Sequence, residues 1–212
     1  GGAEKTVDDE HARAALDLAA RATRAIGEVD ASAAVDLALP LLRAIPIELA
    51  VDARAAALGA RAAVLAKLRR NEDAEAMLND ALHALAGAPA SVTSSLLVDL
   101  ALTQEQTGSI DRARAHLTSA LDRMAPPDHR ADLPHADLPR ADLPRADRPR
   151  AVEALVALTR LHLRAREPAK AKETVRQALD EAKRSEASSS LVVDALTAQA
   201  AIEQVEGNAA AA

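Results

Sequence analysis

Apolar residues along this chain recur at three- and four-residue spacing, in helix-length stretches that come in pairs separated by short polar breaks. This spacing places the apolar residues of each stretch on one face of a helix. Three pairs align well, and the second stretch of each has the pattern Ala-x-x-x-(Leu/Val)-x-x-Ala-Leu. The residues of this pattern are Ala74, Leu78, Ala81 and Leu82, then Ala113, Leu117, Ala120 and Leu121, then Ala171, Val175, Ala178 and Leu179. The sequence therefore predicts a series of helical hairpins.

Incomplete copies of the pattern precede and follow these three pairs. The earlier copy has a second helix that Pro40 should kink, with an apolar stripe formed by Ala34, Ala38, Leu41 and Leu42. The later copy, LVVDALTAQAAIEQVEGN at 191–208, predicts a first helix that breaks at Gly207 and lacks a full second helix. Such an incomplete hairpin would leave an Ala/Val/Leu face uncovered.

The spacing of the hairpins is regular except at one place. Successive anchor alanines at positions 34, 74, 113, 171 and 212 are separated by 40, 39, 58 and 41 residues. A period near 40 residues is typical of stacked helix-turn-helix units. The one long interval contains the tandem pentapeptides of Arg130–Ala151, which we therefore interpret as an insertion.

The pentapeptides have the frame Ala-Asp-Leu-Pro-x, with prolines at Pro134, Pro139, Pro144 and Pro149. This frame also resembles the pentapeptide-repeat family, whose units form a right-handed β-helix, but four units make only about one coil, without a stacked neighbour. Periodic proline excludes a continuous helix and favours extended backbone. We expect a semi-extended inserted loop over 125–149, which is either a duplicated tolerated loop or a segment that contacts a partner or the chain itself.

The hairpins resemble tetratricopeptide repeats, in the longer variety of about 40 residues. The residues that match the family's small positions and turn glycine are Ala101, Ala113, Ala120 and Gly108. The positions that usually hold Trp, Tyr or Phe hold Leu, Val, Gln or His here, and Arg69 and Arg166 lie near the turn position of other copies. The resemblance implies an all-α fold, a right-handed α-solenoid of helix-turn-helix hairpins. A simple helical bundle is the alternative.

The repeats predict an order of segments along the chain. We expect a tail or tag remnant over 1–8, three hairpins over 9–124, the inserted loop over 125–149, a fourth hairpin with a final capping helix over 150–206, and a tail over 207–212. Because the chain has no Phe, Tyr or Trp, its core must consist of Ala, Leu, Val and Ile. Small side chains of this kind allow helix axes to approach closely.

The composition argues against several kinds of chemistry and several kinds of partner. The chain has no cysteine, which excludes disulfides and thiolate chemistry. A net charge of −6 and the lack of aromatic side chains argue against nucleic-acid binding. Charged residues interrupt the longest apolar stretch, so we expect no membrane insertion, and the opening GGAEK lacks the apolar region of a signal peptide. We expect a cytoplasmic protein, the docking or regulatory part of a larger bacterial protein.

Motifs for catalysis and metal binding are scarce. The sequence has no His-Glu-x-x-His, no Gly-x-Ser-x-Gly and no glycine-rich phosphate loop. His129 and His135, near Asp132 and Asp137, could be drawn as a metal site, but they also fit the pentapeptide frame as variants of its arginine. His162 falls where the family often has Tyr, so packing is its expected role. We expect no enzyme, no catalytic residue, no metal and no cofactor.

The resemblance to tetratricopeptide repeats implies a concave groove lined by the first helices of successive hairpins. Carried over position by position, the partner-binding groove consists of Lys67, Val98, Leu102, Glu105, Val156, Arg160, Leu163 and Arg164. Its four apolar members would bind an amphipathic helix or an extended peptide, and its two arginines at i and i+4 could bind a carboxylate. Alternatively, the apolar members pack on the next hairpin and the arginines are solvated.

These observations predict a protein–protein interaction scaffold that binds a partner peptide or helix in a concave groove. The alternative is a structural self-association module, a homodimer formed through the incomplete terminal hairpin. The lack of aromatics and of convergent polar groups disfavours a small-molecule site.

Overall fold

The computed structural model of the protein describes residues 2–125, 148–185 and 189–211. All regular structure in these ranges is helical, without a strand, which confirms the predicted all-α class. The chain divides into two compact units, Gly1–Ser109 and Ile110–Ala212, which are described separately below. The pentapeptides lie outside the described residues up to the beginning of the helix that starts at Arg148.

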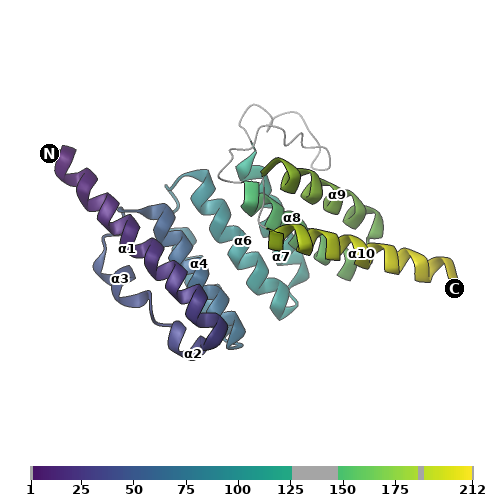
Figure 1. The fold of residues 1–212 in the computed structure, drawn as a ribbon, viewed down its shortest axis with the longest axis horizontal. Helices are drawn as coiled ribbons and strands as arrows, with labels where there is room; N and C mark the ends of the chain where they lie inside the picture. Colours follow the sequence, from purple (N-terminus) through teal and green to yellow (C-terminus); the bar gives the residue numbers. More distant parts are fainter. Residues whose placement is uncertain (1, 126–147, 186–188, 212) are drawn as a thin grey trace. The chain divides into compact units, whose positions relative to one another are not determined.

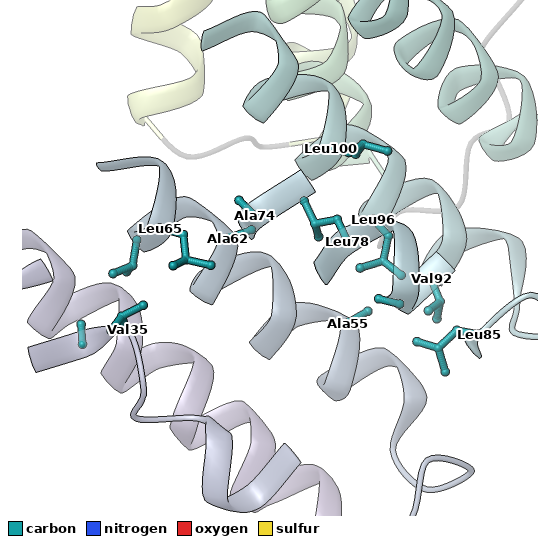
Figure 2. Close-up of a cluster of buried hydrophobic side chains, with 13 residues drawn as sticks. Val35, Ala55, Ala62, Leu65, Ala74, Leu78, Leu85, Val92, Leu96 and Leu100 are labelled. Atoms are coloured by element: carbon teal, nitrogen blue, oxygen red, sulfur yellow. The ribbon is translucent and has the colours of Figure 1, made fainter. Parts of the chain in front are cut away.

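Unit 1 is built around one central helix (Figure 1). Its helices are α1 (Gly2–Val29), α2 (Ala31–Ala34), α3 (Leu39–Ala44), α4 (Val51–Lys67), α5 (Asn71–Ala84) and α6 (Ala90–Thr107). Helix α4 packs against α1, α2, α5 and α6. Figure 2 shows how aliphatic side chains of this core, among them Leu65, Leu78 and Leu96, meet between α4, α5 and α6. Alanine and glycine permit close packing, because a methyl group added at Gly27 of α1 would lie 2.7 Å from Val64 Cγ2 of α4.

The first predicted hairpin differs from the expectation at its second helix. Pro40 does not kink one continuous helix. It lies in the first turn of the short helix α3, separated by a turn from α2. Proline is favoured in the first turn because its missing N–H would have no helical partner there. The second helix of this hairpin is therefore broken in two.

Unit 2 consists of α7 (Ile110–Met124), α8 (Arg148–Arg164), α9 (Pro168–Ser185) and α10 (Ser189–Ala211). Helix α8 packs against α7, α9 and α10, whereas α10 packs against α8 and α9 (Figure 1). The predicted helix break at Gly207 is wrong, because α10 continues through it, whereas the predicted tails over 1–8 and 207–212 stay a prediction. A single glycine in a helix costs about 1 kcal/mol, and the alanines around Gly207 favour helix.

The predicted Ala/Leu stripes are confirmed. On α5, α7 and α9 the first three members of each stripe are buried, as is Leu121, and Leu82 and Leu179 are half-buried. The hairpins are therefore repeat-like in what they bury, as periodic spacing of small and branched apolar residues requires.

The same turn closes three helices. The residue after the last helical turn is in the left-handed conformation in each, with φ of 60° at Arg69, 79° at Gly108 and 58° at Arg166. The following N–H donates to the carbonyl five residues earlier at 2.9 Å, from Arg70 to Leu65, from Ser109 to Gln104 and from Glu167 to His162. These are Schellman caps, which satisfy the last carbonyls of a helix. The repeat thus extends from the stripes to the turns.

Replacing Arg166 by glycine is expected to raise the free energy of unfolding of unit 2 by about 0.5 kcal/mol, because a left-handed conformation is costly for a residue with a Cβ. Gly108→Ala should lower that of unit 1 by about 1 kcal/mol. The space around Gly108 is open, so only the backbone conformation changes. Urea titrations followed by circular dichroism measure both, and destabilisation by Arg166→Gly would contradict the cap.

Candidate functional site

The predicted groove residues of unit 1 lie in different environments. Lys67, at the end of α4, pairs with Glu28 of α1, and its Nζ lies 3.5 Å from the carbonyl oxygen of Gly27. Leu102 is half-buried, but Val98 and Glu105 of α6 are buried, with Val98 fully so. The predicted exposure of Val98 is therefore wrong. Helix α6 is buried around most of its circumference, which is usual for a helix that is apolar on most sides.

The predicted groove residues of unit 2 are also partly used in packing. Val156 of α8 is buried, so its predicted exposure is wrong for the same reason as that of Val98. Leu163 is half-buried against a cluster from α9 and α10. Arg160 is half-buried and Arg164 exposed, and both already interact with other groups. Partner binding by any of these residues stays a prediction.

The exposed apolar residues of α10 are a better candidate. Val193, Leu196 and Ala200 are exposed, the first two at 58% and 50%. Their spacing of three and four residues places them on one helix face. We call these three residues the α10 face. The sequence signal for it was the unpaired final helix, although none of its residues was among the predicted groove residues.

The equivalent face of α8 is buried. Shifting α10 back by 41 residues, the last repeat interval, aligns the α10 face with Val152, Leu155 and Thr159, all of which have no exposed surface. The physical reason lies in the neighbours, because α8 packs against three helices of unit 2 and α10 against two. The α10 face is thus a core-type surface without a covering helix among the described residues.

A groove of about 560 Å³ runs between α9 and α10. Its floor is apolar, with Val175 and Leu179 from α9 and Ile202 from α10, and its rim carries Lys172, Arg176 and other charged groups. Apolar floors with a few polar groups at the edge are typical of binding sites. Val193, Leu196 and Ala200 do not line this groove, so it is a separate feature of α10.

A polar cluster surrounds Glu167, in the turn between α8 and α9. One carboxylate oxygen accepts from Arg114 of α7 at 3.0 Å and lies 2.8 Å from Nδ1 of His162. The other accepts from Lys170 at 3.1 Å. Hydrogen bonds lower the pKa of Glu167 to about 2, and the bond to His162 has the largest effect, ahead of the bond to Lys170. His162 is buried. This cluster joins α7, α8 and α9, which gives His162 the packing role expected from the sequence.

Unit 2 is expected to lose stability as the pH falls from about 4.5 to about 2. Glu167 has a lower pKa folded than unfolded, so its contribution is complete above the unfolded pKa and is lost as pH falls through the folded one. Glu167→Gln should remove up to about one proton from the slope of unfolding free energy against pH in this range. Urea titrations at several pH values measure the slope, and an unchanged slope in the variant would contradict this role.

Metal binding and membrane insertion find no support in the described residues. Within the described ranges no group of three or more His, Asp or Glu is arranged to hold a metal ion, and His129 and His135 lie outside those ranges. In the described part of the chain, no helix has the length and apolar character needed to cross a membrane. No protein-family model matches the chain, and no curated protein matches it.

Proposed function

We propose that the chain is a non-catalytic protein–protein interaction scaffold and that the α10 face is its docking surface. One observation carries this proposal: Val193 and Leu196 are half-exposed at positions where the preceding repeat buries Val152 and Leu155 completely. The resemblance to tetratricopeptide repeats, a family of docking modules, supports the same class of function. The docking surface proposed here replaces the concave groove, because Val98 and Val156 are buried.

The two half-exposed side chains of the α10 face can supply part of a binding energy. Burying a Val or Leu side chain fully contributes about 1.5–3 kcal/mol, so completing the burial of these two contributes about 1 kcal/mol each. A charge at the centre of such a surface should weaken binding by at least about tenfold.

Affinity capture from the cells that produce the protein tests the proposal. We expect a partner to be recovered with the unmodified chain and reduced at least about tenfold with Leu196→Lys. Leu18→Lys is the matched control, because Leu18 is also exposed, at 62%, but lies on α1 in unit 1. Equal recovery with Leu196→Lys and the unmodified chain would refute the α10 face as docking surface.

Self-association is the second candidate, because the same exposed face could pair with its copy. Charge opposes it: α10 contains three acidic residues and no basic one, so two α10 faces would bring like charges together. We expect a monomer in sedimentation experiments over a range of concentrations. A dimer that Leu196→Lys dissociates would favour the self-association module instead.

A further inference from the structure

No helix covers the α10 face among the described residues. In the repeat, the missing helix would be the second helix of the hairpin that begins with α10. Helix α8 has the second helix of its own hairpin, α9, packed against it, and α4 likewise has α5. Helix α10 packs against α8 and α9, which precede it, and against no later helix in the described part of the chain. We propose that the α10 face binds an amphipathic helix with an Ala/Leu stripe and a net positive charge, which packs on α10 as α9 packs on α8. This inference rests on the proposed docking function.

The Ala/Leu stripe of the proposed partner helix is inferred from the helices that pack against first helices elsewhere in the protein. The second helices α5, α7 and α9 all present Ala-x-x-x-(Leu/Val)-x-x-Ala to their neighbours, and these residues are buried. The α10 face has the same kind of surface, with branched residues at Val193 and Leu196 and a small one at Ala200. Small residues on both sides allow the close approach that helix packing of this kind requires. A helix with larger side chains in its stripe would fit less well.

The charge follows from the surroundings of the face. Asp194 and Glu203 are both exposed on α10, which has no basic residue of its own. Glu203 also accepts from Gln199 and lines the α9–α10 groove with Lys172 and Arg176. In unit 2 the second helices carry an excess of basic residues, three against two acidic ones in α7 and five against three in α9. A partner helix with such an excess would complement the carboxylates. A second copy of α10 would add three more negative charges.

The probe for this inference is a fluorescent peptide with the sequence of α9, Pro168–Ser185, titrated with the full 212-residue protein. We expect saturable binding, seen as increased anisotropy, that Leu196→Lys weakens at least about tenfold. A control peptide in which Lys172, Arg176 and Lys183 are replaced by Glu keeps the stripe and should bind at least about tenfold more weakly. The protein variant Asp194→Lys/Glu203→Lys should bind this control peptide in preference to the original one.

Three results would overturn the inference. They are no binding of the α9 peptide, binding that persists in Leu196→Lys, and equal binding of the two peptides. If one of these occurs while affinity capture is still lost in Leu196→Lys, the docking surface stands and only the chemistry of the partner is wrong. If capture is also insensitive to Leu196→Lys, the proposed function fails with it.

Discussion

Replacing Arg54 by methionine is expected to lower the free energy of unfolding of unit 1 by about 3 kcal/mol. The Arg54 side chain is buried on α4 and donates to three backbone carbonyls, to Leu42 at 2.9 Å, to Ile45 at 2.6 Å and to Pro46 at 2.9 Å. The last carbonyls of a helix have no partner within it, so the arginine supplies donors that α3 and the segment after it lack. Methionine keeps the apolar stem and removes all of them.

The guanidinium is needed for its geometry as well as its charge. Burial lowers the pKa of Arg54, and Glu48 partly opposes this shift, but arginine stays protonated in proteins. Arg54→Lys keeps a charge on a single donor atom that cannot reach three carbonyls, so we expect a loss of about 2 kcal/mol. Arg43→Met, at an exposed position of α3, is the matched control and should change stability by less than about 0.5 kcal/mol. Urea midpoints from circular dichroism report all three, and an Arg54→Met midpoint equal to that of Arg43→Met would contradict this role.

Replacing Leu155 by alanine is expected to destabilise unit 2 by about 3 kcal/mol, whereas Leu196→Ala should cost less than about 1 kcal/mol. The two leucines occupy equivalent places 41 residues apart, but Leu155 has no exposed surface and Leu196 is 50% exposed. Removing a buried isobutyl group loses its full transfer free energy and leaves a cavity. Removing a half-exposed one loses only part of that free energy and leaves no full cavity.

Thermal and urea unfolding of the two variants measure the difference directly. Because helix propensity changes in the same way in both, their difference reports burial alone. Equal destabilisation would mean that Leu196 is covered in solution and would remove the basis of the docking surface.

The helical hairpins could be predicted because their signal is local. Periodic Ala and Leu on α5, α7 and α9 encode both the helix and its buried face, and the structure confirms these stripes. The place of the turns could also be predicted, since Arg69 and Arg166, which lie near the turn position, adopt the same left-handed conformation as Gly108. Their left-handed backbone was not predictable from residue type, because a residue with a Cβ disfavours it. The cap bonds around them supply the compensation.

The exposed surface could not be predicted as reliably, because exposure depends on neighbours that are distant in sequence. The apolar pattern of α6 and α8 does not show which side of each helix is exposed. Val98 and Val156 were placed on the exposed side, but packing around these helices buries them. The α10 face has the same Val and Leu as the equivalent face of α8, but α10 packs against fewer helices of unit 2 than α8 does. Arg54 was missed for a related reason, since its partners are backbone carbonyls, which leave no mark in the sequence.

The most direct test of the docking surface uses the absence of cysteine from the chain. Single cysteines introduced by Ala200→Cys on α10 and Thr159→Cys on α8 occupy equivalent places, one exposed and one fully buried. We predict that the thiol of Ala200→Cys reacts at least about a hundredfold faster than that of Thr159→Cys, and that a partner bound to the α10 face slows it at least about tenfold. Slow labelling of Ala200→Cys in the free protein, or labelling that a bound partner leaves unchanged, would contradict the α10 face as the docking surface.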